Sequence, residues 1–169
     1  MRVAALYDIH ANLPALEAVL EDVRHADVDQ VVVGGDIVPG PMPGEALELL
    51  LGLDIPVQFI HGNGELAVLA QVGVDADSVT YWGTTSGEPL PEPLREVLRW
   101  TAKEIHPQYD HVLRSWPRTR RLNVAGLGDV LFCHTHGVSC RALPITGPGM
   151  AEWSMAVVLR TDRLFQPYL

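Results

Sequence analysis

Residues 2–23, RVAALYDIHANLPALEAVLEDV, decide the fold that the rest of the chain extends. The apolar residues 2–7 predict a buried strand that ends at the polar Asp8. A helix follows, because leucine and valine recur at helical spacing along residues 13–23. Asn12 can cap this helix. The stretch therefore predicts a strand followed directly by a helix, with polar residues at the junction.

The alternation of strand and helix continues along the chain. Further strands are predicted at residues 30–34 and 57–60, because both runs are short and largely apolar. Helices are predicted at residues 45–53 and 66–72, and the glycines within residues 62–64 end the third strand. The order β-α-β-α-β-α is typical of a parallel sheet with right-handed crossovers.

The second half of the chain has a weaker pattern. Residues 75–93 are polar and rich in glycine and proline, which predicts an irregular segment. Beyond it, the predicted elements are helices at residues 94–105 and 108–115 and strands at residues 121–124 and 130–133. Residues 150–169 fit either one helix or a helix and a strand. The whole chain therefore predicts an α/β fold.

Length and composition describe one globular domain. The 169 residues can build one sizeable core, so we expect a single domain over residues 1–169. Apolar residues make up 47% and charged residues 20%, which argues against a disordered chain. Twelve Lys and Arg against 21 Asp and Glu give a net charge of −9, which disfavours general binding to nucleic acid or to an anionic membrane.

Several features predict a cytoplasmic protein. Two cysteines, Cys133 and Cys140, are too few for a disulfide framework and favour a reducing compartment. No uninterrupted apolar run approaches about 18 residues, so no membrane span is expected. Asp8 and His10 interrupt the apolar run at the N-terminus, which therefore does not resemble a secretory signal.

Polar residues gather at the carboxyl ends of four predicted strands, in residues 8–10, 34–36, 61–65 and 133–137. In an open α/β sheet the carboxyl ends of the strands border the ligand site, so we expect these segments to meet in one crevice. The oxygen and nitrogen donors that they contain are Asp8, His10, Asp36, Asn63, His134 and His136.

This set of donors suits Mn, Fe, Ni or Zn. A carboxylate such as that of Asp36 can bridge two ions, and two ions can activate water and clamp phosphate oxygens. Taken singly, each residue has an ordinary explanation: Asp8 as a turn former, Asn63 in a left-handed turn and His134 as a core histidine. Their joint occurrence after four strands predicts a metal site. Glu65 is either an acceptor behind the ligands or a first-turn helix acid.

The four segments resemble the motifs of the calcineurin-like metallophosphoesterases, which here read Asp8-x-His10, Gly35-Asp36, Gly62-Asn63 and the strand end at His134. The likeness is greatest to their small bacterial single-domain phosphodiesterases and extends over about residues 1–140. The resemblance implies a two-sheet β-sandwich flanked by helices. It also implies a binuclear metal centre whose hydroxide attacks the phosphorus of a phosphodiester or of another small phosphorylated molecule.

The resemblance assigns roles to single residues. Asp8 and His10 would bind the first ion, Asp36 would bridge both ions, and Asn63 and His134 would bind the second. His10, Asp36 and Asn63 would be the catalytic residues. The resemblance implies two divalent ions, and we expect Mn²⁺, with Ni²⁺, Fe²⁺ or Zn²⁺ as the other candidates.

Two departures from the family pattern bear on activity. Gly64 stands where many relatives carry a histidine that protonates the leaving group, a contribution of about 10²–10⁴-fold. The family's later two-histidine motif is matched only by residues 133–136. Either His134 is the earlier ligand and the chain stops before that motif, or a deletion makes His134 and His136 the later pair. We favour the first, in which His136 or water supplements the first ion and the second sheet is incomplete.

Three functions follow as hypotheses. The first is a metal-dependent phosphoesterase for a small phosphorylated substrate, without a membrane or nucleic-acid partner and able to form a homodimer at an open sheet edge. The alternative is a non-catalytic or weakly active descendant that binds metal or phosphate. The third is nucleic-acid processing, which the acidic net charge opposes. It rests on Trp116 and a basic cluster of Arg114, Arg118, Arg120 and Arg121.

Overall fold

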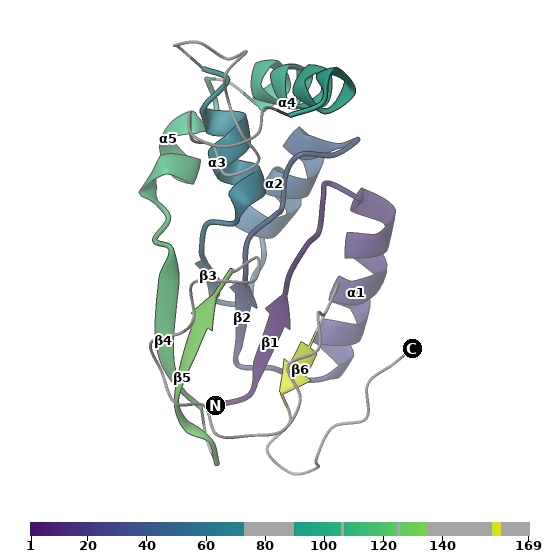
Figure 1. The fold of residues 1–169 in the computed structure, drawn as a ribbon. Helices are drawn as coiled ribbons and strands as arrows, with labels where there is room; N and C mark the ends of the chain where they lie inside the picture. The colour runs from purple at the N-terminus through teal and green to yellow at the C-terminus, as the bar shows by residue number, and fades with distance from the viewer. Residues whose placement is uncertain (73–89, 106, 125, 135–156, 160–169) are drawn as a thin grey trace.

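The computed structural model describes residues 1–72, 90–105, 107–124, 126–134 and 157–159. Within them, a four-stranded sheet has the order β3-β2-β1-β6 and a two-stranded sheet has the order β4-β5. Helices lie along one side of the larger sheet and beyond the ends of its strands, while β4 and β5 lie on its other side (Figure 1). The arrangement is a two-sheet sandwich flanked by helices, as predicted.

The larger sheet is parallel except at one edge. Its parallel strands are β1 (Val3–Leu6), β2 (Gln30–Val33) and β3 (Val57–Phe59). β6 (Val157–Leu159) pairs with β1 in the antiparallel direction. The second sheet consists, among the described residues, of the antiparallel pair β4 (Thr119–Val124) and β5 (Gly128–Cys133). The parallel part agrees with the predicted order, and β6 falls in the segment that had two interpretations.

The described helices are α1 (Leu13–His25), α2 (Pro43–Leu51), α3 (Asn63–Leu69), α4 (Glu92–Ile105) and α5 (Asp110–Ser115). The predicted cap of α1 is confirmed, because Oδ1 of Asn12 accepts a hydrogen bond of 3.3 Å from the backbone N–H of Ala15. The side of α1 that faces the sheet is apolar, with Leu16, Leu20 and Val23 buried.

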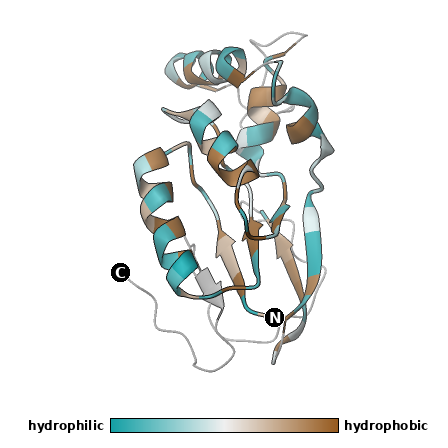
Figure 2. Ribbon diagram, turned by 180° about the vertical axis from the view of Figure 1, so that it is seen from behind, coloured by the Kyte–Doolittle hydropathy of each residue, from teal (hydrophilic) through white to brown (hydrophobic). Residues whose placement is uncertain are grey.

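Alternation along the strands divides the core into two layers. Ala4 and Leu6 of β1 pack into the cluster shared with the helices. Val3 and Ala5, which point to the opposite face, pack with Phe132 of β5 between the two sheets. Both faces of the parallel sheet are therefore covered, which is why its strands are largely apolar (Figure 2).

The predicted helix at residues 66–72 begins earlier than expected. The glycines on either side of Asn63 suggested a break, whereas Asn63 is the first residue of α3. Glu65, the third residue of this helix, explains the difference: its Oε2 accepts a hydrogen bond of 2.7 Å from the backbone N–H of Gly62. This contact starts the helix directly after the third strand and places Asn63 at its first turn, not in a left-handed turn.

Some predictions concern residues outside those that the structure describes. They are His136, Cys140, most of the irregular segment at residues 75–93, and most of residues 150–169. None of the described helices is long and apolar enough to cross a membrane.

Candidate metal centre

The strand ends converge as the sequence predicts. Asp8 and His10 follow β1, Asp36 follows β2 and His134 follows β5. Asn63 begins α3 shortly after β3. In Figure 1 the ends of β1, β2 and β3 point toward α2, α3 and α4, so these side chains meet where the sheet ends and the helices begin.

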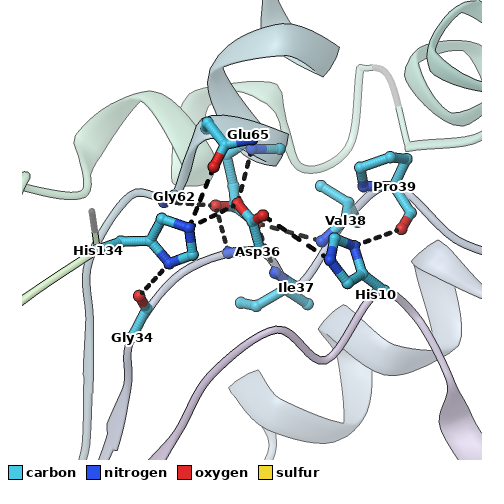
Figure 3. Close-up of polar contacts among 11 residues, drawn as sticks. His10, Gly34, Asp36, Ile37, Val38, Pro39, Gly62, Glu65 and His134 are labelled. Carbon is cyan, nitrogen blue, oxygen red and sulfur yellow. Dashed lines mark hydrogen bonds and ion pairs between the residues drawn. The ribbon is translucent and has the colours of Figure 1, made fainter. Parts of the chain in front are cut away.

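Asp36 lies at the centre of the group, between two imidazole rings (Figure 3). Its Oδ2 is 3.8 Å from Nε2 of His10, and its Oδ1 is 3.5 Å from Nε2 of His134. Oδ1 also accepts a hydrogen bond of 2.7 Å from the backbone N–H of Gly64. The two oxygens of one buried carboxylate therefore serve two different sides of the site.

Both histidines are oriented by backbone carbonyls. Nδ1 of His134 lies 3.0 Å from the carbonyl oxygen of Gly34, and Nδ1 of His10 lies 3.3 Å from that of Pro39. A carbonyl only accepts, so Nδ1 carries the proton in each ring. In the neutral imidazole this leaves a lone pair on Nε2, and each lone pair points toward Asp36.

Acceptor atoms consequently converge on both sides of Asp36. On one side, Nε2 of His134 lies 3.1 Å from Oδ1 of Asn63 and 3.5 Å from Oδ1 of Asp36. On the other side, Asp8, His10 and Asp36 each offer a donor atom within 4.8 Å of the others. Lone pairs that face one another in this way are stabilised by a cation, and carboxylate, amide and imidazole donors suit a divalent metal.

The backbone around the site is strained. Four residues at the strand ends adopt positive φ angles: Asp8 at 52°, His10 at 47°, Ala11 at 49° and Asp36 at 54°. Among the described non-glycine residues, only Asp27 shares this conformation. Such strain costs on the order of 1–3 kcal/mol per residue and persists where surrounding bonds enforce it. Here the backbone N–H of His10 donates to the carbonyl of Asp36 at 2.8 Å, which ties the first two strand ends together.

Glu65 of α3 holds the Asp36 loop in place through hydrogen bonds. Its side chain is fully buried, and its two carboxylate oxygens accept four backbone hydrogen bonds. The donors are the N–H groups of Asp36 at 3.0 Å, Ile37 at 2.7 Å, Val38 at 3.2 Å and Gly62 at 2.7 Å. Burial and the neighbouring Asp36 raise the pKa of Glu65, and the backbone donors oppose that rise. Both roles suggested by the sequence are realised, since Glu65 is a first-turn helix acid and an acceptor behind the candidate ligands.

Burial also shapes the electrostatics of Asp36 and Tyr7. Loss of solvation raises the pKa of Asp36, and the increase is opposed by His134 when it is protonated, by the backbone N–H of Gly64, and by His10 when it is protonated. Burial, followed by repulsion from Asp8, raises the pKa of Tyr7 to about 12, so its phenol is neutral at physiological pH. The Tyr7 ring stacks on the His134 ring with centroids 6.3 Å apart. The sequence did not indicate this stacking contact, because Tyr7 was predicted only as the last residue of a strand.

Gly64 is present because no side chain fits there. A β-carbon at this position would lie 2.0 Å from the carbonyl oxygen of Val38 and 3.0 Å from Oδ1 of Asp36. The histidine that the family resemblance implies for this position would therefore require the loop that carries Asp36 to shift. The lack of a proton-donating side chain at position 64 therefore follows from how α3 packs against the Asp36 loop.

The profile of the calcineurin-like phosphoesterases matches residues 1–159. The chain belongs to this family. An uncharacterized protein of Methanocaldococcus jannaschii is 30% identical over 135 residues, which make up 79% of this chain and 49% of that protein. The predicted family membership is confirmed, and the family is one of phosphoester hydrolases.

Solved structures agree with this assignment. A hypothetical protein of Pyrococcus horikoshii has a TM-score of 0.62 at 24% identity, covering 77% of this chain and 53% of its own, and shows the fold. A metallophosphoesterase of Sphaerobacter thermophilus has a TM-score of 0.51 at 31% identity, covering 71% of this chain and 42% of its own. The chain spans about half the length of the relatives that it matches.

The basic cluster lies on α5, on β4 and between these two elements. Arg118, Arg120 and Arg121 are exposed, on or just before β4. Trp116 is not a free stacking surface, because its ring packs on Phe59 with centroids 4.7 Å apart and an interplanar angle of 8°. Arg114 pairs with Asp110 at 2.8 Å. The aromatic residue that motivated a nucleic-acid site therefore belongs to the packing of α5 against β3.

Proposed function

We propose that this chain is a metal-dependent phosphodiesterase that holds two divalent ions, one on each side of Asp36. The observation that carries the proposal is the placement of the two Asp36 oxygens. Oδ2 faces His10, and Oδ1 faces His134, whose Nε2 also contacts Asn63. A carboxylate directed to two separate groups of acceptors is suited to bridging two ions.

The residues divide into two sets of ligands. Asp8, His10 and Asp36 would hold one ion, and Asp36, Asn63 and His134 would hold the other. His136 remains a candidate for the first ion but lies outside the described residues. We expect Mn²⁺, with Ni²⁺, Fe²⁺ or Zn²⁺ as the other candidates.

When bound, the ions would supply an activated water and neutralise charge on the phosphate. The protein's own contribution is orientation. The carbonyls of Gly34 and Pro39 direct the two imidazoles, and Glu65 fixes the loop that carries Asp36. The His10 side chain is 47% exposed, so this side of the centre is open to substrate.

The packing of Gly64 selects for a particular kind of ester. Since no side chain fits at this position, no group there can protonate a leaving oxygen. An ester with a basic leaving group would lose about 10²–10⁴-fold in rate without such an acid, whereas an aryl ester would be affected less. We therefore propose activated or aryl phosphodiesters as the favoured substrates.

Gly64 also supports a second candidate, a domain that binds metal or phosphate without turnover. The acceptor atoms around Asp36 suffice to hold cations, while position 64 has no space for a side chain that could act as a general acid. Binding without hydrolysis would be the property of this second candidate.

The test is hydrolysis of bis(p-nitrophenyl) phosphate by the full chain with Mn²⁺, Ni²⁺, Fe²⁺ or Zn²⁺. We expect turnover in the wild type and a loss of at least about 100-fold in Asp36→Asn, since the amide cannot bridge two cations as a carboxylate does. Asp54→Asn, at an exposed position away from the site, is the matched control and should keep full activity.

The possible outcomes separate the two candidates. Turnover that survives in Asp36→Asn would place the activity elsewhere and contradict the proposal. Metal binding in the wild type without hydrolysis under any of the four metals would select the non-catalytic candidate.

A further inference from the structure

A cleft with a volume of about 250 Å³ begins at the candidate metal centre. Its polar end is formed by the centre itself, through His10, Asp36 and Asn63. Pro39 and Gly64 lie beside them. The cleft has room for a small organic group, and the candidate ligands open into it.

The far end of the cleft is apolar. The remaining lining residues are Ala67, Leu90, Leu94, Val97 and Leu98, from α3, α4 and the residue that precedes α4 by two positions. Among the described residues that line it, no charged or hydrogen-bonding side chain stands outside the candidate centre. The described lining residues therefore form a phosphate end and a hydrocarbon end, and none of them outside the centre would recognise a sugar hydroxyl or a second charged group.

The apolar wall extends beyond what the core requires. The buried side chains of α4 include Leu98, Ala102 and Ile105, which pack into the core. Leu94 and Val97 continue the same helical stripe toward the N-terminus of α4, yet Leu94 is only half-buried and Val97 is 41% exposed. Two large apolar side chains that line a cleft and remain partly exposed are positioned to contact a ligand.

We infer that this cleft receives the organic group of the phosphate ester and that this group is apolar, an aryl or branched alkyl substituent. The inference rests on the proposed function, since the phosphate must lie at the Asp36 end for the substituent to reach α4. An aromatic ring against Ala67, Leu94 and Val97 would leave water, whereas a nucleoside would lose hydrogen bonds that the described residues of this wall do not replace.

The first test measures binding, which does not depend on turnover. Phenylphosphonate and methylphosphonate carry the same charged head and cannot be hydrolysed, and their affinities for the Mn²⁺-equilibrated protein can be compared by calorimetry. We expect phenylphosphonate to bind at least about tenfold more tightly, the discrimination that a hydrophobic pocket gives to added carbon.

Two variants of one helix make the comparison specific. Val97→Asn places an amide on the apolar wall and should reduce the phenyl preference about fivefold or more. Trp100→Asn is the matched control, because Trp100 is 43% exposed on the same helix but does not line the cleft. We also expect Val97→Asn, and not Trp100→Asn, to raise KM for bis(p-nitrophenyl) phosphate while Mn²⁺ affinity stays unchanged.

The outcomes distinguish this inference from the proposed function. Hydrolysis with equal affinity for the two phosphonates would overturn the apolar cleft and leave the enzyme proposal standing. A phenyl preference that Val97→Asn abolishes, in a protein that hydrolyses nothing, would support the cleft and reject the enzyme. No detectable binding of either phosphonate, or equal effects of the two variants, would overturn the inference.

Discussion

The backbone N–H of Gly64 donates to Oδ1 of Asp36 at 2.7 Å, and a β-carbon on Gly64 would stand 2.0 Å from the carbonyl oxygen of Val38. The first turn of α3 thus packs directly against the loop that carries the central carboxylate. This contact leaves no room to move one without the other, so the geometry of Asp36 depends on the absence of a side chain at position 64.

Gly64→Ala should therefore destabilise the protein. The new methyl group would force the first turn of α3 away from Val38, at a cost of about 1–3 kcal/mol in the free energy of unfolding. The hydrogen bond to Asp36 would lengthen at the same time, so Mn²⁺ affinity should also fall. Urea unfolding and Mn²⁺ titration measure the two effects.

Gly44→Ala is the matched control for that substitution. Gly44 is also the second residue of a helix, α2, and no atom lies within 4 Å of a β-carbon built on it. Alanine there should be neutral or stabilise by about 0.4–1 kcal/mol, through the reduced entropy of the unfolded chain. Equal stability of the two alanine variants would contradict the close contact at Gly64.

Glu65→Gln should lower the free energy of unfolding strongly, although the two side chains are almost the same size. The carboxylate accepts four backbone N–H groups, whereas the amide would present its own N–H₂ to some of those donors. Leaving buried donors unpaired in this way costs about 2–4 kcal/mol. Urea unfolding of the metal-free protein checks the value. Glu17→Gln, at an exposed position of α1, should change stability by less than about 0.5 kcal/mol, and a similarly small effect at Glu65 would refute its structural role.

The sequence predicts the parts of this fold that depend on local pattern. The short apolar runs mark β1, β2 and β3, and the side chain of Asn12 marks the start of α1. The convergence of Asp8 and Asp36 could also be anticipated, because the parallel strands β1 and β2 bring their carboxyl ends to one edge. His134 comes from β5 of the second, antiparallel sheet, so its approach to Asp36 depends on how the two sheets pack.

What local pattern could not show depends on contacts between distant segments. Gly62 and Gly64 suggest a break in the chain, yet α3 starts there. The Glu65 carboxylate that accepts from Gly62 is also bonded to Ile37 on another loop, a contact that local pattern does not show. The stack of Tyr7 on His134 joins β1 to the end of β5, and neither residue type signals it. β6 has three residues and is held by pairing with β1, so no periodicity marks it.

The metal-free protein should lose stability in mild acid through His61. This residue is buried, its Nδ1 has no hydrogen-bond partner, and its ring lies against Trp116 with centroids 6.2 Å apart. Burial, with repulsion from Arg118, lowers the pKa of His61 in the folded state. As pH falls through about 6.5, the unfolded chain takes up a proton that the folded chain does not, so the free energy of unfolding decreases.

The contribution of His61 can be isolated by substitution. In EDTA, His61→Phe should reduce the fall in unfolding free energy between pH 7 and pH 5 by removing one proton from the unfolded state's uptake. His25→Phe, at an exposed position on α1, should leave the slope close to that of the wild type. If the wild type and His61→Phe show the same slope, His61 is not a buried neutral imidazole.

Metal content of single-histidine variants tests whether Asp36 serves two ions. If Oδ1 and Oδ2 face separate ions, then His134→Ala and His10→Ala should each lower the Mn²⁺ content from two ions per chain toward one, because each removes a ligand from one side only. Elemental analysis of desalted protein measures the content, with His111→Ala on the exposed face of α5 as the control. Asp36→Asn should lower the Mn²⁺ content on both sides, because Asp36 is the ligand that the two ions share. One ion in the wild type, lost equally in both histidine variants, would instead mean a single mononuclear site and would contradict the bridging role of Asp36.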